Sequence, residues 1–466
     1  MKFSVEVGSL RDAVAHAQVT TDTALPIYQG LYLKASQTDT GGKLEVFSMK
    51  PGSKALFTIP ATVLEAGSQV VRGEQLLSGL RGQKNSELVT LTYSTKLNRL
   101  CGVCAGSRFT LAILDGQQQL STNLNLLPVD STSGSIYDAA LLRGVVKRAA
   151  WCAHRDASGA ITVDALDFKS TPEGYKVLAT DGYIAVRVEV RTDHESTDRV
   201  ILKESLETLS KFLSLEPDAQ VRVISGEPVD GLVRETFFRA PGFFYGANVC
   251  DVKMPAIETI FSQPGFQPQR EVLITRSVLV STLGRIAGFV EKAAPSVKLS
   301  LRGSVLTLST ASEEGDCVEK LDVAYSDHSK LKESDDVTVV YVSSKFLAKI
   351  LTSVESEVLM LGLRNAMSPL IVSDEHNDEI NTRYVVMTVR GNFEAKDEET
   401  VEVAVVVPAP VREVLSVADD TSFLDDLRDE DEDEIPVLDD EEDEILAELE
   451  EGHDRSTSDE LPVGSV

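Results

Sequence analysis

The chain contains few of the residues from which catalytic and metal centres are usually built. Its 466 residues include five cysteines, six dispersed histidines and one tryptophan. It has no phosphate-binding loop of the Walker type, no histidine pair at metal-binding spacing and no serine in a nucleophile-elbow pattern. We therefore expect no catalytic residues, no metal and no cofactor.

The cysteines are odd in number and scattered along the chain: Cys101, Cys104, Cys152, Cys250 and Cys317. Cys101 and Cys104 form a lone CxxC, whereas a zinc ribbon needs a second pair. A thioredoxin-like site would start a helix after its first cysteine, but the neighbouring residues are typical of a strand. We interpret all five as free core or surface thiols in a reducing compartment.

Long apolar runs are missing as well. No segment approaches the ~18 apolar residues that a membrane-spanning helix needs. The opening residues, "MKFSVEV", alternate as a strand does and contain no signal-peptide apolar core. These features favour a cytoplasmic protein without a membrane partner.

Negative charge is abundant, but it is unevenly placed. The formal net charge is −29. Residues 391–466 hold 28 acidic and 4 basic residues, which leaves 46 acidic and 41 basic residues in the rest of the chain. A segment of such charge cannot bury enough apolar surface to offset its ordering entropy, so we expect a largely disordered acidic tail.

One pattern of predicted helices occurs three times before this tail. Helices are predicted from Ser9, Asp138 and Thr275, and a second series from Arg72, Ile201 and Val342, with steps of roughly 130 to 140 residues in each series. A polar stretch, 121–135, reads as a linker between the first two copies. The predicted domains are 1–122, 130–255, 256–390 and the tail 391–466.

The helix predicted over 138–154 has a clear two-sided pattern. At 100° per residue its apolar side chains fill one continuous side, which indicates a core face. Its cations, among them Arg143, Lys147 and Arg148, fall on the opposite side.

Four segments together resemble the bacterial DNA polymerase III beta subunit, the beta sliding clamp, including phage-encoded versions. They are "MKFSVEV" followed by "LPI" at 25–27, "LATDGYIAV" at 178–186, "VKMPAIETIF" at 252–261 and "YVVMTVR" at 384–390. Their order and spacing agree with the family over almost all of residues 1–390.

The resemblance implies an α+β fold of three tandem DNA-clamp (processivity-fold) domains. In this family two subunits close head to tail into a ring, with sheets outside and helices lining the hole. The ring encircles double-stranded DNA without sequence specificity and tethers a DNA polymerase, and a clamp loader opens it. It implies a non-enzymatic replication factor in the cytoplasm, associated with the nucleoid, or in the host cytoplasm if the chain is viral.

Helix cations are the expected DNA contacts, because Lys and Arg bind phosphates without reading sequence. An ordinary solvated helix charge is the alternative for each. The candidates are Arg72, Arg81, Lys84, Arg143, Lys147, Arg148, His154, Arg155, Lys203, Lys211, Arg285, Lys292, Lys345 and Lys349. Asp22 stands where the family often has a DNA-contacting arginine.

The resemblance also implies a groove between the second and third domains that accepts apolar partner peptides. The matching positions are Val163, Thr180, Gly182, Tyr183, Pro255, Ile260, Val385, Val386, Met387 and Val389. A plain core role for Val385 and Val386 is the alternative. The ring interface is expected to join Phe109 and Leu111 of one subunit to Phe289 and Val290 of the other.

Two questions remain open from the sequence. The first is the role of the tail, which either solubilises the protein, competes with partner peptides through its "SFLDDL" segment at 422–427, recruits a further factor, or acts on DNA electrostatically. The second is the function of the whole chain. The whole chain could instead be an acidic DNA-mimic or inhibitory protein that works through this tail, although three tandem units are not needed for mimicry.

Overall fold

The computed structural model describes residues 1–389 except 23, 40, 130, 156–163, 194–197, 229, 231, 253, 292–294, 313–314, 329–337 and 375–378. Contacts divide the chain into Met1–Pro410 and Val411–Val466, and all described residues belong to the first unit. The acidic tail predicted from residue 391 thus lies outside the described residues. None of the helices described is long and apolar enough to cross a membrane.

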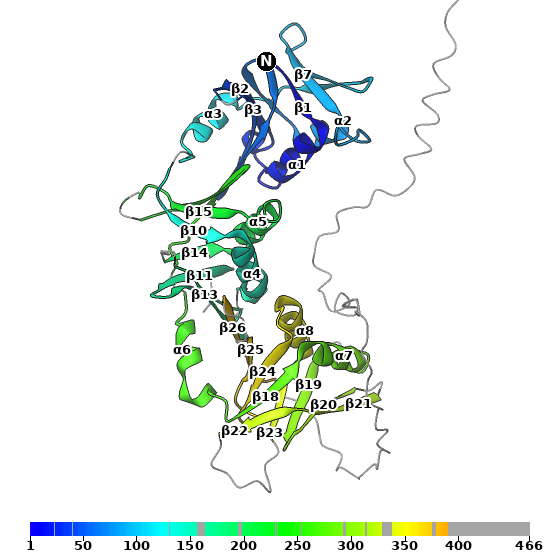
Figure 1. Ribbon diagram of the computed structural model, residues 1–466, viewed down its shortest axis with the longest axis vertical. Coiled ribbons are helices and arrows are strands. Elements are labelled where there is room, and N and C mark those ends of the chain that lie inside the picture. The colour runs from blue at the N-terminus through cyan, green and yellow to red at the C-terminus, as the bar shows by residue number, and fades with distance from the viewer. Residues whose placement is uncertain are drawn as a thin grey trace, which may run out of the picture. The chain divides into compact units, whose positions relative to one another are not determined.

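Two smaller antiparallel sheets belong to the first and third repeats (Figure 1). The five-stranded sheet has the order β5-β1-β7-β8-β9 and the four-stranded sheet β21-β20-β19-β23. Their strands are β1 (Lys2–Glu6), β5 (Thr62–Glu65), β7 (Leu88–Ser94), β8 (Arg99–Cys104), β9 (Ser107–Ala112), β19 (Ser296–Arg302), β20 (Val305–Ser312), β21 (Gly315–Asp322) and β23 (Thr338–Ser343).

An eight-stranded sheet joins the first repeat to the second. Its order is β10-β15-β16-β17-β4-β3-β2-β6, and the repeats meet where β4 pairs with β17. Its strands are β2 (Leu31–Thr38), β3 (Gly41–Lys50), β4 (Ser53–Pro60), β6 (Gly67–Val71), β10 (Ser135–Asp138), β15 (Gln220–Ser225), β16 (Glu235–Ala240) and β17 (Phe243–Asn248).

A nine-stranded sheet joins the second repeat to the third in the same way. Its order is β14-β11-β12-β13-β26-β25-β24-β18-β22, with seven residue pairs between β13 and β26. Its strands are β11 (Ala165–Thr171), β12 (Gly174–Thr180), β13 (Ile184–Arg191), β14 (Arg199–Leu202), β18 (Arg270–Thr275), β22 (Ala324–Asp327), β24 (Val358–Leu363), β25 (Leu370–Asp374) and β26 (Ile380–Val386).

Both series of predicted helices are present, one pair in each repeat. The pairs are α1 (Val7–Gln18) with α2 (Gly73–Gly79), α4 (Ala139–Ala149) with α5 (Lys203–Leu213), and α7 (Arg276–Ala287) with α8 (Ser344–Ser353). In α4 the apolar spacing works as predicted, because Leu142, Val145, Val146 and Ala149 are all buried. Short 3-10 turns are η1 (Pro26–Tyr28), η2 (Ala150–Cys152) and η3 (Pro264–Phe266).

Two further helices occupy the opposite faces of the large sheets. They are α3 (Gln117–Asn125) and α6 (Ile257–Ser262). The prediction of a plain linker over 121–135 is therefore wrong at its start. The sequence of α3 is mostly polar, but Leu120 and Leu124 bury themselves against the eight-stranded sheet, and this packing holds the helix.

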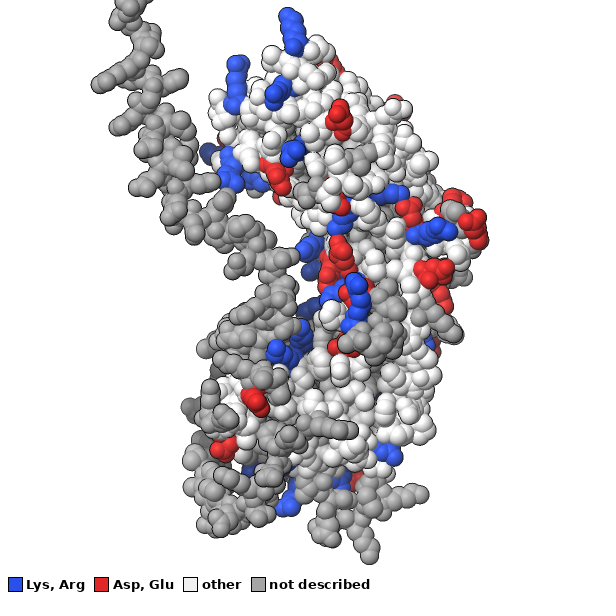
Figure 2. Space-filling model, turned by 180° about the vertical axis from the view of Figure 1, so that it is seen from behind, with Lys and Arg blue, Asp and Glu red and all other residues white. Residues whose placement is uncertain are grey.

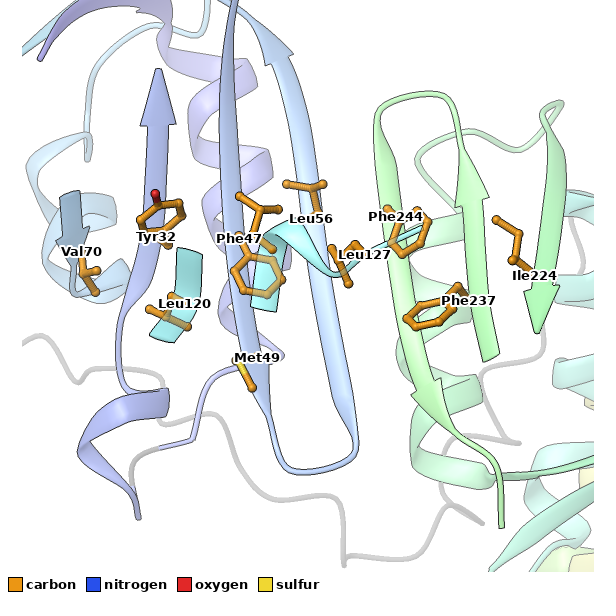
Figure 3. Packing of buried hydrophobic residues seen from close by; sticks show 11 residues of the cluster. Tyr32, Phe47, Met49, Leu56, Val70, Leu120, Leu127, Ile224, Phe237 and Phe244 are labelled. Atoms are coloured by element: carbon orange, nitrogen blue, oxygen red, sulfur yellow. The ribbon is translucent and has the colours of Figure 1, made fainter. Parts of the chain in front are cut away.

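The core beneath α3 spans the first junction. Figure 3 shows Leu127 between Leu56 of the first repeat and Phe237 and Phe244 of the second, with Leu120 farther away near Tyr32 and Phe47. On the other face Phe57 packs edge-on against the ring of Phe212 at 5.1 Å. Side chains from two repeats thus form one continuous core, so the junction is a packed interface rather than a linker.

Candidate functional site: a cationic helix face and an apolar groove

The helix pairs lie on one face of the sheets and α3 and α6 on the other. Helices α1 and α5 pack on β4 and β17 of the eight-stranded sheet, and α4 packs on β12, β13 and β26 of the nine-stranded sheet. Figure 2 shows Lys and Arg side chains gathered along the side on which Figure 1 draws the helix pairs. One face therefore combines helices with positive charge.

Most predicted DNA-facing cations are accessible to solvent on these helices. The exposed or half-buried ones are Arg72, Arg81, Lys84, Arg143, Lys147, His154, Arg155, Lys203, Lys211, Arg285, Lys345 and Lys349. Lys292 lies outside the described residues. Asp22 accepts a hydrogen bond from the backbone N–H of Ala24 at 2.7 Å and shapes its own turn.

Some of these cations are already paired with carboxylates. Lys147 Nζ lies 3.0 Å from Glu355 Oε1, and its hydrogen bond lowers the pKa of Glu355. Arg285 donates two hydrogen bonds of 2.9 Å to Glu319, which lower the pKa of that carboxyl. In the described part of the chain no carboxylate pairs with Arg81, Lys84, Arg143 or Lys211.

Arg148 is a correction to the predicted basic face. Its side chain is only 2% exposed and lies against Asp374 of the third repeat, with Nη2 3.8 Å from Oδ2. Its backbone carbonyl accepts a hydrogen bond from the hydroxyl of Tyr384 at 3.1 Å. A helical projection of one segment could not reveal this contact, because the partner comes from a strand more than 200 residues away.

Arg11 is a further cation beside Arg81 and was not among the predicted DNA contacts. This residue and Arg81 line a hollow of about 580 Å³ between α1 and α2. The Arg11 guanidinium donates to the carbonyls of Leu80 and Gln83 at 2.9 Å each. The sequence pattern of the first helix could have identified Arg11, because its position next to the apolar residues places the cation on the polar side of the helix pair.

The predicted peptide groove centres on the hairpin between β12 and β13. Asp181 Oδ1 accepts the backbone N–H groups of Tyr183 and Ile184 at 2.8 and 2.7 Å, and Gly182 takes a φ of +91° that favours glycine. The hairpin is tied to the third repeat because Met387 N–H donates to Tyr183 O at 2.8 Å. This turn places an aromatic side chain beside the end of β26.

The groove candidates divide into exposed and buried residues. Tyr183, Met387 and Val389 are 68%, 38% and 37% exposed, an unusual grouping of apolar side chains. Gly182 is exposed, Pro255 and Ile260 are half-buried, and Thr180 is buried. Val163 lies outside the described residues.

Val385 and Val386 are corrections to the groove. They are 2% and 0% exposed, so neither offers a surface to an added peptide. Val385 packs in the core under α6 with Leu178 and Phe261. Successive side chains of a strand point to opposite faces of the sheet, so Val386 of β26 lies on the other face.

The two smaller sheets each end in a strand with an unpaired edge. Among the described strands, β9 pairs only with β8, and β21 pairs only with β20. Of the predicted interface residues, Phe109 and Val290 are half-buried and Phe289 is 38% exposed, but Leu111 is only 3% exposed and belongs to the core. Exposed strand edges are normally covered or paired, so these two are candidate interfaces.

The cysteines form no site in the described part of the chain. All five are free thiols, and Cys101 and Cys104 lie on strand β8 as the sequence indicated. Burial raises the pKa of the Cys152 thiol, which makes a reactive thiolate there unfavourable. No group of three or more potential metal ligands occurs among the residues described.

Comparison with known proteins agrees with this geometry. Residues 266–390 match the family model of the DNA polymerase III beta subunit, C-terminal domain. A search of curated protein sequences finds no match. The chain resembles the solved structure of the Bacillus subtilis sliding clamp, with a TM-score of 0.70 and 17% sequence identity. The match covers 84% of this chain and 99% of the Bacillus subtilis chain.

Two further solved structures give the same result. The Pseudomonas aeruginosa clamp bound to griselimycin has a TM-score of 0.69 at 18% identity, and the Thermotoga maritima beta subunit 0.67 at 17%; each match covers 84% of this chain and 99% of the other. The chain has the fold of a bacterial beta sliding clamp. The α+β clamp fold and the resemblance inferred from four sequence segments are confirmed.

Proposed function

We propose that the chain is a DNA polymerase processivity clamp without catalytic activity of its own. Two copies close head to tail into a ring around double-stranded DNA and tether a polymerase, and a clamp loader opens the ring. Such a protein works in the cytoplasm, at the nucleoid or in an infected host cell.

The observation that carries this proposal is the segregation of charge and helices onto one face. Cations such as Arg81, Lys84 and Arg143 stand on the helix pairs without carboxylate partners in the described part of the chain. A ring holds DNA by topology, so a few exposed cations suffice. Tighter phosphate contacts would resist sliding.

The open edges support the head-to-tail dimer. In this arrangement β9 of one subunit lies beside β21 of the other, and each closes an edge that pairs with nothing else in the described chain. The charges are complementary, since Arg99 and Arg108 lie on β8 and β9 whereas Asp316 and Asp322 lie on β21. A heterologous contact of this kind closes into a ring when the rotation permits it.

The exposed apolar side chains of Tyr183, Met387 and Val389, where the groove is expected, support partner binding. A flexible methionine beside an exposed aromatic ring suits apolar peptides of varied sequence. A few such anchors carry most of the energy of an interface. Polymerase and loader segments are the partners that this groove would accept in turn.

Retention on DNA tests the function directly. The full chain is loaded by a clamp loader onto a nicked circle, which is then either kept closed or linearised. A clamp stays on the closed circle and runs off the free ends of the linear form. Equal retention on both forms would show ordinary DNA binding and would overturn the proposal.

A second candidate is an acidic DNA-mimic or inhibitor, favoured only by the charge of residues 391–466. Size distinguishes the two, because the clamp must be a dimer and a mimic need not be. Removal of residues 391–466 should abolish an inhibitory activity that depends on the tail, but it should leave retention on closed circular DNA intact if the chain is a clamp. We favour the clamp because three tandem repeats serve a ring and contribute nothing to mimicry.

A further inference from the structure

A second hollow lies on the sheet face away from the helix pairs. It has a volume of about 500 Å³ and is lined by residues of both the first and second repeats. Leu56 and Phe244, which Figure 3 shows at the junction, lie beneath it and are only 5% and 4% exposed, and the half-buried Val129 and Ile136 form its apolar floor. The proposed clamp function uses neither this face nor these residues.

Two arginines at the rim of this hollow are directly opposite each other. Arg222 of β15 and Arg239 of β16 are register partners in an antiparallel pair. Arg222 Nη1 donates to the carbonyl of Thr132 at 2.8 Å, and Arg239 Nη1 donates to that of Ser131 at 3.3 Å. These bonds fix the direction of both guanidinium groups without neutralising them.

This arrangement is electrostatically unfavourable as it stands. Like charges opposite each other on antiparallel strands are destabilising. No carboxylate of the described chain lies within ion-pair distance of Arg222 or Arg239. Lys43 at the same rim is different, because its Nζ lies 2.6 Å from Glu45 Oε1. Among the described residues, the positive charge of the hollow that lacks a carboxylate partner therefore belongs to the arginine pair, whose remaining N–H groups can still donate.

We propose that this hollow binds an acidic peptide segment of a partner protein. A carboxylate accepts hydrogen bonds from Arg222 and Arg239, and a neighbouring Leu or Phe side chain of the peptide covers Val129 and Ile136. The volume suits a few side chains, and arginine recognises carboxylates with charge-assisted bonds. An apolar floor favours a peptide over a nucleic-acid backbone, which has no apolar side chain to place there.

This surface would give the protein a second partner site at its first junction, separate from the groove at Tyr183. The inference is independent of the clamp function, since it rests on the first junction alone. A chain that fails to stay on circular DNA could still bind the peptide, and the two failures are therefore distinguishable.

Fluorescence anisotropy of the full chain tests the proposal. The probe is a fluorescein-labelled hexapeptide, Asp-Leu-Asp-Phe-Asp-Leu, and the matched probe has Asn for every Asp. We expect saturable binding of the acidic probe and at least tenfold weaker binding of the Asn probe. The double variant R222Q/R239Q should weaken the acidic probe at least tenfold, whereas R234Q/R302Q, with the same change in charge on exposed sites, should change it less than twofold.

Thr58→Glu provides a second variant that leaves both arginines in place. Thr58 is exposed at the lip of the hollow, so a carboxylate there repels the probe without disturbing the core. Binding should fall at least tenfold while the circular dichroism spectrum and melting temperature stay unchanged. Unchanged affinity in both R222Q/R239Q and T58E would overturn the proposal. So would equal competition by a single-stranded oligonucleotide of matched charge, because the site would then be a polyanion site.

Discussion

The guanidinium of Arg148 and the carboxylate of Asp374 face each other at 3.8 Å with side chains 2% and 1% exposed. They belong to α4 of the second repeat and β25 of the third. Ser356 donates to the other carboxylate oxygen, Oδ1. A buried charge pair, with Ser356 bound to its carboxylate and the Gly144 carbonyl bound to its guanidinium, thus lies inside the second junction.

The first prediction concerns this pair. Arg148→Met leaves Asp374 buried without its cation, and breaking a buried pair from one side costs about 3–5 kcal/mol of unfolding free energy. The double variant R148M/D374L should recover most of that loss, because it removes both charges. Urea unfolding can be followed by the fluorescence of Trp151, the chain's one tryptophan, which stacks on Tyr384 at 5.9 Å.

Arg143→Met is the matched control for this experiment. It removes a half-buried cation from the same helix and should cost less than about 1 kcal/mol. If R148M lost less than about 1 kcal/mol of unfolding free energy, or if the double variant recovered none of the loss, Arg148 would not be the cation that stabilises buried Asp374.

The second prediction concerns DNA. Arg81 and Lys84 are exposed beside α2 and have no carboxylate partner among the described residues. Each phosphate contact contributes about 0.9 to the slope of log K against log salt. R81Q/K84Q should therefore reduce that slope by about 2 on a short duplex. K96Q/R302Q changes the same charge on the exposed β7–β8 and β19–β20 hairpins and should leave the slope unchanged. Equal effects of both double variants would exclude the helix face as the DNA site.

How far the sequence could lead is clearest from Arg148 and α3. Apolar spacing located the six paired helices, because their buried faces pack on the repeat's own sheet. It placed Arg148 in solvent, since one helix contains no information about Asp374. Helix α3 was missed because it has only Leu120 and Leu124 as core residues, and both depend on a sheet built from two repeats. The periodicity of a sequence does not predict contacts between repeats.

The candidate surfaces divide in the same manner. Segment matching located the hairpin at Asp181–Ile184 and the end of β26, but it could not tell exposed Met387 from buried Val386. Arg222 and Arg239 are separated by 16 intervening residues in sequence, and only the register of β15 and β16 makes them neighbours.

The third prediction concerns the groove. Tyr183→Ala and Met387→Ala remove two exposed anchors, and loss of an interface hot spot costs about 2 kcal/mol or more. A neutral fluorescent peptide that carries a Leu and a Phe should bind each variant at least tenfold more weakly. Met367→Ala, an 83% exposed methionine on another loop, should bind it like the unmodified chain. Equal affinity in all three variants would place the peptide site elsewhere.

The fourth prediction concerns the dimer. Phe289 is 38% exposed at the end of α7, close to the strand β21 proposed to pair with β9. A carboxylate at this position would be buried on association, so Phe289→Asp should shift the protein to single chains of 50.6 kDa. Mass photometry measures this shift, with Met367→Asp as the control that stays dimeric. A dimeric F289D would exclude this surface from the interface.

The fifth prediction concerns alkaline pH. Burial raises the pKa of Tyr245 to about 12, although hydrogen bonds with Ser205 and Thr208 oppose the shift. Above the usual value of about 10 the unfolded chain loses this proton while the folded chain keeps it. The folded state then binds more protons, so stability falls as the pH rises from about 10 to 12.

Tyr245→Phe should flatten this dependence. A pKa difference of about two units at one group changes the free energy of unfolding by at most about 2.7 kcal/mol. Between pH 10 and 12 the unmodified chain should therefore lose up to that amount of stability more than the variant does. At pH 8 it should be less stable by about 1–2 kcal/mol, because the hydroxyl's hydrogen bonds are gone. Urea unfolding at several pH values measures both effects. Tyr183→Phe alters an exposed ring and serves as the control; a Y245F curve parallel to that control would show that Tyr245 does not set the alkaline limit.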